Sequence, residues 1–210
     1  MNQYKARATQ GQKRILFILF LIMLFFIVWY IIVNFSPGEI QPGIQVHEPP
    51  DQGEVSIDIT FRKGEYTIIP LASFEMKGKV LAKKRYRLGR ESELSPYDLA
   101  MGWERMSDEA ILQKIKIRQS NRWYYWSVKE WPIPRREIET SSANMHIIPA
   151  NNKIKKLVGE TSKWDLIRLK GYLVKVIADD NWIWKSSLTR KDTGNHSCEV
   201  IWVEEFYVID

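Results

Sequence analysis

Residues 15–33 read ILFILFLIMLFFIVWYIIV, an unbroken run of nineteen apolar or aromatic side chains without a charge. A helix rises about 1.5 Å per residue, so a run of this length crosses most of a hydrocarbon core about 30 Å thick. Trp29 and Tyr30 lie near its downstream end, where aromatic rings favour the level of the lipid headgroups. The segment predicts a transmembrane helix over 15–33, with the lipid bilayer as a partner.

The flanks of this segment predict its orientation. A cleaved signal peptide has an apolar region of about 7 to 15 residues and a small-residue cleavage site, whereas here the run is longer and residues 34–38 offer no such site. No Lys or Arg follows the run before Arg62. Four basic residues and no acid precede it: Lys5, Arg7, Lys13 and Arg14. The positive-inside rule then predicts a retained anchor with a cytoplasmic tail over 1–14 and an extracytoplasmic remainder.

The charge balance and the cysteine count exclude some classes of function. The chain has a formal net charge of +6, and four of its basic residues lie in the short tail. The remainder is nearly neutral, so we expect no nucleic-acid partner. Cys198 is the only cysteine, which excludes an internal disulfide. The domain must therefore be stabilised by a packed core.

The next segment, 34–53, is rich in proline and glycine and predicts an extended linker. The predicted extracytoplasmic domain covers 54–210. It opens with alternating apolar and polar residues from Val55 to Arg62, and the alternation returns around Phe74 and Met76. This period of two is typical of half-buried strands, so the domain is expected to begin with antiparallel strands.

The middle of the domain mixes helix and strand signals. Ser95, Pro96 and Asp98 supply an N-cap, a first-turn proline and a capping acid, which predict a short helix through about Gly102. A second short helix is expected after Ser107. Strands are predicted farther along, over residues 116–119, 122–127 and 144–149.

The last third has the strongest strand pattern. Ile167 and Leu169 share one face, but after Gly171 the apolar phase moves to Tyr172 and Val174, which predicts a β-bulge at the glycine. Long bent strands of this kind close small barrels. The predicted fold is mainly β with short helices (α+β), in which an antiparallel domain ends in a part that resembles a small OB-like barrel.

Residues 196–198 read His-Ser-Cys, which places an imidazole and a thiol on one face of a strand. The spacing is similar to the His-Gly-Cys core of L,D-transpeptidases, and the resemblance implies Cys198 as nucleophile with His196. That family has glycine before the nucleophile and arginine shortly after it, and this chain has neither. The alternative is that Cys198 is a small core residue beside Val200 and Trp202.

A membrane anchor before a β-rich domain also resembles type I signal peptidases. Their Ser-Lys dyad would correspond to Ser141 or Ser142 with Lys155 or Lys156. In that family several strands separate the two residues, whereas only about thirteen residues separate them here. The resemblance therefore lacks the intervening fold.

Metal and cofactor motifs are absent from the sequence. The three histidines, His47, His146 and His196, form no paired-ligand motif with Cys198 or with acids. The glycines form no phosphate-binding loop. We therefore predict no metal site and no cofactor, and we interpret the histidines as ordinary polar residues.

The densest aromatic cluster lies between Arg122 and Trp131. If residues 122–127 form a strand, both faces carry aromatic rings, so one face can pack inward while the other offers a stacking surface beside Arg122. The predicted binding residues are Arg122, Trp123, Tyr125 and Trp126. The alternative is that both faces are buried.

Five segments of the chain together resemble an uncharacterised family of bacterial single-pass membrane proteins. They read SPYDLAMGW, RQSNRWYYW, PIPRREIETSSANMHIIPA, GYLV and WIWKSSLTRKDTG, the last followed by CE. Glu104 departs from the Gly-Trp-Gly of that family. The resemblance implies a location in the bacterial inner (plasma) membrane, and it implies no function.

The sequence thus leads to two functional hypotheses. The first is a membrane-tethered extracytoplasmic binding or scaffolding module that contacts another envelope protein or a glycan. The second is an anchored hydrolase or transpeptidase that acts on peptide or peptidoglycan through Cys198 and His196. An enzyme needs a preorganised nucleophile and base, and this pair is a partial set.

Overall fold

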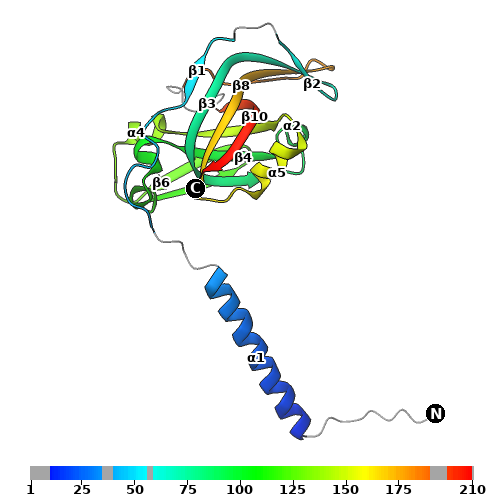
Figure 1. The fold of residues 1–210 in the computed structure, drawn as a ribbon, viewed down its shortest axis with the longest axis vertical. Coiled ribbons are helices and arrows are strands. Elements are labelled where there is room, and N and C mark those ends of the chain that lie inside the picture. The colour runs from blue at the N-terminus through cyan, green and yellow to red at the C-terminus, as the bar shows by residue number, and fades with distance from the viewer. Residues whose placement is uncertain (1–9, 35–39, 56–58, 190–197, 210) are drawn as a thin grey trace, which may run out of the picture. The chain divides into compact units, whose positions relative to one another are not determined.

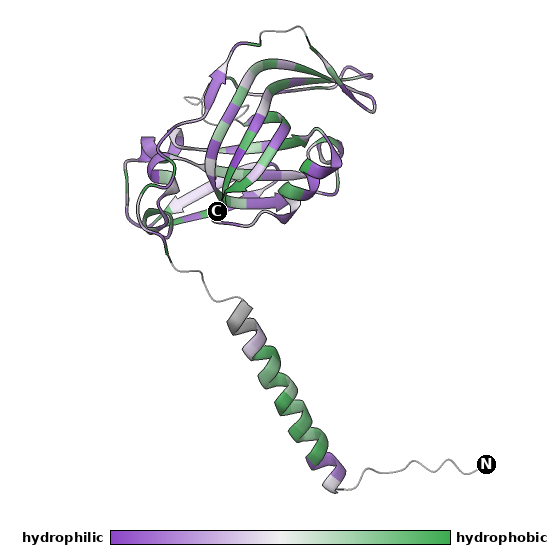
Figure 2. Ribbon diagram, in the orientation of Figure 1, coloured by the Kyte–Doolittle hydropathy of each residue, from purple (hydrophilic) through white to green (hydrophobic). Residues whose placement is uncertain are grey.

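The computed structural model describes residues 10–34, 40–55, 59–189 and 198–209, and the chain divides into two compact units at Gln41. The first unit contains helix α1 (Gln10–Asn34). Its side chains over residues 10–30 are exposed, and Figure 2 colours most of the helix as hydrophobic after a hydrophilic start. α1 is one N-terminal apolar helix that could span a membrane or serve as a signal sequence.

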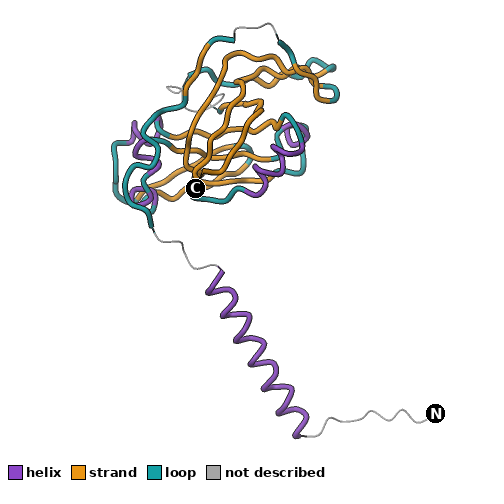
Figure 3. Tube along the Cα trace, viewed as in Figure 1, coloured by secondary structure: helices purple, strands orange, loops and turns teal. Residues whose placement is uncertain are grey.

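The second unit is a mixed, mostly antiparallel β-sheet domain with short helices (Figure 3). Its strands are β1 (Asp51–Gly53), β2 (Phe61–Lys63), β3 (Tyr66–Arg85), β4 (Tyr97–Gly102), β5 (Ile115–Ser120), β6 (Trp123–Val128), β7 (Ser142–Pro149), β8 (Leu166–Ala178), β9 (Ile183–Lys185) and β10 (Glu199–Ile209). Its helices are α2 (Glu91–Leu94), the 3-10 helix η1 (Glu104–Ser107), α3 (Glu109–Leu112), α4 (Arg135–Thr140) and α5 (Asn152–Glu160). The predicted α+β class, mainly β with short helices, is confirmed.

The pairing of the long strands returns to its starting point. β3 pairs with β4, β4 with β7, β7 with β10, β10 with β8, and β8 pairs again with β3 (Figure 1). Of these five pairs, β7–β10 is parallel and the other four are antiparallel. β1 and β2 add to β3, and β9 adds to β8. β5 and β6 form a separate two-stranded hairpin.

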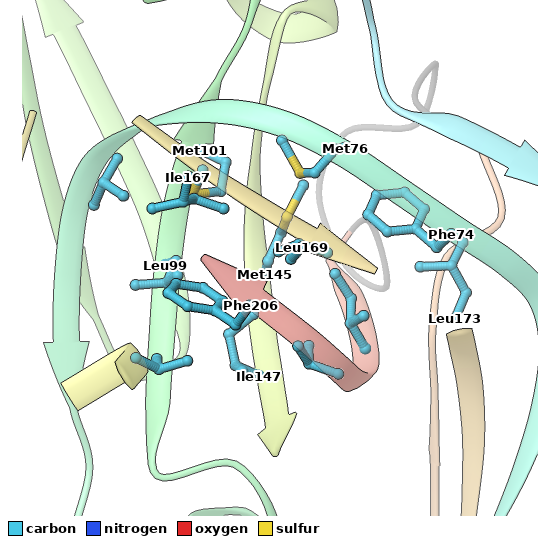
Figure 4. Packing of buried hydrophobic residues seen from close by; sticks show 14 of the residues in the cluster. Phe74, Met76, Leu99, Met101, Met145, Ile147, Ile167, Leu169, Leu173 and Phe206 are labelled. Atoms are coloured by element: carbon cyan, nitrogen blue, oxygen red, sulfur yellow. The ribbon is translucent and has the colours of Figure 1, made fainter. Parts of the chain in front are cut away.

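The largest core cluster is filled by the alternate residues of these five paired strands. Burying one such side chain stabilises the fold by about 1.5–3 kcal/mol. The labelled members in Figure 4 are Phe74, Met76, Leu99, Met101, Met145, Ile147, Ile167, Leu169, Leu173 and Phe206. The alternation read from the sequence around Phe74 and Met76 therefore describes the inner face of β3 correctly.

The phase change in β8 has a different cause from the one predicted. Ile167, Leu169 and Leu173 belong to the largest cluster, whereas Val174 and Val176 belong to a second cluster on the other face of the strand. The register shifts lie in the neighbouring strands, between Pro70 and Ala72 of β3 and between Val203 and Glu205 of β10. The bulge predicted in β8 is therefore wrong. The apolar phase changes because the first part of β8 contributes one face to the largest cluster, whereas its last part contributes the opposite face to the second cluster.

The helix predicted from Ser95 to about Gly102 is wrong, because residues from Tyr97 to Gly102 form the strand β4. The strand lies between β3 and β7, and its residues from Asp98 to Gly102 are all buried. A strand buried on both faces reads as a continuous apolar run, which hides the alternation. Here tertiary pairing outweighed the local capping signal.

Other local predictions hold. The expected second helix is η1 followed by α3, and the N-cap is Asp108, whose side chain accepts a hydrogen bond from Ala110 N at 2.9 Å. The strands expected over residues 116–119, 122–127 and 144–149 correspond to β5, β6 and β7. The strand expected from Val55 to Arg62 is found only at its end, where Phe61 and Arg62 belong to β2; Val55, Ile59 and Thr60 are not in a strand, and residues 56–58 lie outside the described part.

Part of the predicted linker packs against the domain. Gln41 N donates to the Glu109 carboxylate at 2.9 Å, and Val46 is buried in the largest cluster. Glu109 also pairs with the buried Lys79. Burial opposes ionisation of Glu109, but Lys79 and Gln41 hold its pKa below the ordinary value. From Gln41 onward, the proline-rich segment therefore has fixed partners in the sheet domain.

A substitution at Gly171 tests how closely the backbones of β8 and β10 approach each other. A Cβ at this position would lie 1.9 Å from the carbonyl oxygen of Trp202, so the two backbones would have to separate. We expect Gly171→Ala to cost about 2 kcal/mol or more of folding stability, measured by unfolding of the detergent-solubilised protein. Ser127→Ala on the exposed edge of β6 is the control and should change little. An unchanged Gly171→Ala protein would contradict the close approach.

Candidate functional site

The tip of the β5–β6 hairpin is a two-residue turn with unusual backbone angles. Asn121 and Arg122 have φ values of 51° and 66°. Two successive left-handed residues define a type I′ turn, which matches the twist of a hairpin. Asparagine tolerates this region, but arginine does so at a cost. Other contacts of Arg122 must therefore offset the cost of this backbone conformation.

The side chain of Arg122 turns inward and pairs with a buried carboxylate. Its Nη1 donates to Asp98 Oδ1 at 2.7 Å and to Ser95 O at 2.9 Å. Its guanidinium lies 4.0 Å from the ring centroid of Tyr86, whose hydroxyl accepts from Arg122 N at 2.9 Å. Burial raises the pKa of Tyr86, which therefore stays neutral at physiological pH. These contacts fasten the hairpin tip to the outer face of β4.

His146 approaches the same oxygen of Asp98 as Arg122 does. Its Nδ1 is 3.0 Å from Asp98 Oδ1, and its ring centroid is 4.9 Å from that of Trp184. The approach has ion-pair distance without the angles of a hydrogen bond. A proton on Nδ1 would face the carboxylate oxygen, whereas an unprotonated Nδ1 would set a lone pair against it.

Asn144 connects the hairpin to Cys198. Its Oδ1 accepts from Gln119 Nε2 at 2.6 Å, and its Nδ2 donates to Arg122 O at 3.0 Å. The same Nδ2 lies 3.9 Å from the sulfur of Cys198. Two strong hydrogen bonds thus fix the orientation of the amide that approaches the thiol. We call Asp98, Arg122, Asn144, His146 and Cys198 the polar cluster.

Three of the five residues of the polar cluster are buried, Arg122 and Cys198 are half-buried, and the cluster is incompletely hydrogen-bonded. Asp98 is fully buried, His146 is 3% exposed and Asn144 is 4% exposed. Among the described members of the cluster, three buried atoms make no hydrogen bond, Asp98 Oδ2, Arg122 Nη2 and His146 Nδ1, and Oε1 of the neighbouring Gln119 makes none either. An unsatisfied buried polar group costs about 1–3 kcal/mol, and more when charged. Several unsatisfied buried polar atoms in one place reduce folding stability, and such groups are often kept for a function. The cluster is therefore a candidate functional site.

The β5–β6 hairpin has one packed face and one exposed face. Tyr124, Trp126 and Val128 pack against a third core cluster. Burial raises the pKa of Tyr124 to about 12. On the other face Tyr125 is 40% exposed, and the guanidinium of Arg118 lies 5.0 Å from its ring centroid. The structure thus separates the predicted binding residues: Tyr125 is exposed, Trp123 is half-buried, Trp126 packs inward, and Arg122 belongs to the polar cluster.

The structure does not show the two predicted catalytic pairs, Cys198 with His196 and a serine at 141 or 142 with a lysine at 155 or 156, in contact. Cys198 is half-buried, and His196 lies outside the described residues. Ser141 donates to Glu104 Oε2 and Ser142 to the Ile138 carbonyl, each at 2.5 Å. Among the described residues, neither serine forms a hydrogen bond with a lysine. The same residues contain no group of three or more His, Cys, Asp or Glu able to hold a metal ion.

Sequence reasoning missed most of the polar cluster. Asp98 was interpreted as a capping acid and His146 as an ordinary polar residue, although both stand in apolar strand segments. A polar side chain inside an otherwise apolar strand was the available signal. The pairing of β4 with β7 and of β7 with β10 then brings the residues together.

Comparison of the chain with protein-family models, with curated proteins and with solved structures found no match. The resemblance to bacterial single-pass envelope proteins therefore stays a prediction. Glu104, where the chain departs from the glycine of that family, has a φ of 47°, in the left-handed region that favours glycine.

The Asp98–Arg122 pair predicts a large stability effect. Arg122→Leu would leave a fully buried carboxylate without its cation, so we expect a loss of about 3–5 kcal/mol in denaturant unfolding. The double variant Arg122→Leu with Asp98→Asn should recover part of this loss, because the uncompensated charge is removed. Arg118→Leu on the exposed face is the matched control. Equal effects of Arg118→Leu and Arg122→Leu would contradict the buried pair.

Proposed function

We propose that the protein is a membrane-tethered, extracytoplasmic binding or scaffolding module of the bacterial cell envelope. In this proposal the exposed face of the β5–β6 hairpin contacts another envelope protein or a glycan. The observation that carries the proposal is the division of the hairpin into a face packed on the core and an exposed face with stacked Arg118 and Tyr125. Exposed aromatic and arginine side chains are favoured at interfaces.

The location is supported by α1 and its flanks. The helix is apolar, Lys13 and Arg14 lie in its first turns, and the chain has no further Lys or Arg before Arg62. We infer that α1 is a retained signal anchor with its N-terminus in the cytoplasm. Residues from Gln41 onward are then extracytoplasmic, in the compartment of the cell envelope.

The architecture supports a binding role. We infer that the closed path of β3, β4, β7, β10 and β8 is a small OB-like barrel, with α5 in the connection between β7 and β8. Barrels of this kind bind ligands on the outer face of their second and third strands and on adjoining loops. In this path those strands are β4 and β7, against which the tip of the hairpin lies.

The chemistry of the exposed face favours a polar or anionic partner. Lys116 lies opposite Ser127, and Arg118 lies opposite Tyr125, and all four are exposed. The face therefore offers two cations and an aromatic ring without a carboxylate among these four residues. Rings of this type stack on sugars or insert at protein interfaces, while the cations select against positively charged partners.

A reporter fusion tests the orientation. A reporter that is active only in the cytoplasm, fused after Asp210, should be silent in bacteria, whereas the same reporter fused before residue 10 should be active. N-terminal sequencing should find residues 15–33 retained in the mature protein. Strong cytoplasmic activity of the C-terminal fusion would reverse the topology.

Site-specific photo-crosslinking tests the contact surface. A photo-crosslinking aromatic residue at position 125 should give a discrete adduct in native membranes, and Arg118→Glu should abolish it. Position 207 on β10 is the matched control, because Tyr207 is 54% exposed and lies outside the hairpin. Protease or glycosidase treatment of the adduct then distinguishes a protein from a glycan. Equal adducts at both positions would contradict a specific surface.

Truncation variants separate binding from folding. Trp126→Ala should cost about 3–5 kcal/mol of stability, because its ring packs on the third cluster and on Trp131. Tyr125→Ala should leave the unfolding midpoint nearly unchanged but lower capture of the partner by about tenfold or more. Parallel losses of stability in both variants would contradict the proposal.

A further inference from the structure

Positive charge gathers at the base of the β5–β6 hairpin. Residues 114–136 contain one acid, Glu130, and seven basic residues: Lys114, Lys116, Arg118, Arg122, Lys129, Arg135 and Arg136. The register pairs Ile115 with Val128, so Lys114 and Lys129, which flank that pair, come together at the base. Both are exposed, and neither forms an ion pair with a described residue. Because neighbouring like charges repel, this end of the hairpin favours an anionic surface.

An exposed tryptophan follows these cations. Trp131 is 56% exposed, and its ring contacts that of Trp126 edge-on, with 5.9 Å between the ring centroids. Trp126 packs on the third core cluster, which also contains the buried Ile133. The core therefore supports the Trp131 ring from one side, while much of the ring stays exposed. Tryptophan in this situation favours the level of the lipid headgroups, where one part of the ring meets apolar chains and the other meets water.

The segment that comes from α1 joins the domain next to the hairpin base. Gln41 N donates to the carboxylate of Glu109 in α3, and α3 leads into β5 through Gln113 and Lys114. Residues 35–40 connect α1 to Gln41, and a chain of this length extends to about 25 Å at most. An anchor in a bilayer therefore keeps the base of the hairpin within reach of the lipid headgroups.

We propose that the hairpin base, formed by Lys114, Lys129 and Trp131, docks on the anionic lipid headgroups of the membrane that holds α1. This inference rests on the proposed function, in which α1 is a retained anchor. The two lysines attract the lipid phosphates, and the indole ring enters the headgroup region. Arg118 and Tyr125 lie farther along the hairpin and stay available for the partner. The lipid contact and the partner contact are then neighbours on one hairpin.

Fluorescence quenching of the full-length protein in lipid vesicles tests the docking. In a Cys198→Ser background, Ser127→Cys carries a fluorescent label beside Lys129, and Tyr207→Cys carries the same label on β10 as the control; both positions are exposed. The vesicles contain phosphatidylglycerol or only phosphatidylcholine, with a quencher on some headgroups. With phosphatidylglycerol we expect quenching at 127 to exceed that at 207 about threefold or more. With phosphatidylcholine alone, or in about 1 M salt, this excess should fall by about half or more.

Charge reversal connects the contact to the two lysines. Lys114→Glu with Lys129→Glu should reduce the quenching at 127 by about half or more, because both attractive charges become repulsive. The matched control is Lys170→Glu with Lys185→Glu, which reverses two exposed lysines outside the hairpin and should leave the quenching unchanged. Equal effects of the two double variants would overturn a specific contact of the hairpin base.

Carbonate washing of the same vesicles separates the anchor from the docking. We expect the protein to stay in the washed vesicles and the label at 127 to remain quenched. Protein that is lost on washing would overturn the retained anchor, and the docking with it. Protein that is retained, but whose label at 127 is quenched no more than the label at 207, would overturn the docking alone.

Discussion

A fully buried carboxylate, Asp98, constrains the arrangement around it. A buried charge has to be paired, because an uncompensated one costs several kcal/mol. Its cation comes from Arg122, on a hairpin that belongs to a different sheet. The pairing requires the hairpin tip to lie on β4, and it explains why an arginine adopts a left-handed backbone conformation there. The exposed face of the hairpin and the polar cluster thus depend on the same ion pair.

The closed path of strands gives this pair its neighbours. β7 lies between β4 and β10, so Asp98 meets His146 on one side of β7 and Cys198 meets Asn144 on the other, although these residues are far apart in the sequence. The same path forces β8 to bury different faces along its length and to approach β10 closely at Gly171. The order in which the strands pair therefore determines both the packing of the core and the position of the polar cluster.

The sequence predicted the elements whose periodicity is local. The apolar run of α1, the alternation in β3 and the aromatic strand β6 were readable, because each repeats within a few residues. β4 was not, because its pairing on both sides outweighs the cap-like Ser95 and Asp98. Arg122 was identified from the aromatic rings next to it, but its partner could not be, since strand register over long separations leaves no trace in one sequence.

The most direct test of the central role of Asp98 is the protonation of the His146 ring. Long-range ¹H–¹⁵N NMR of the full-length protein, assigned by loss of signals in His146→Gln, distinguishes the two ring nitrogens. We predict that the neutral ring carries its proton on Nδ1, facing Asp98, and that Asp98→Asn changes this preference. A neutral ring with its proton on Nε2 would contradict the account.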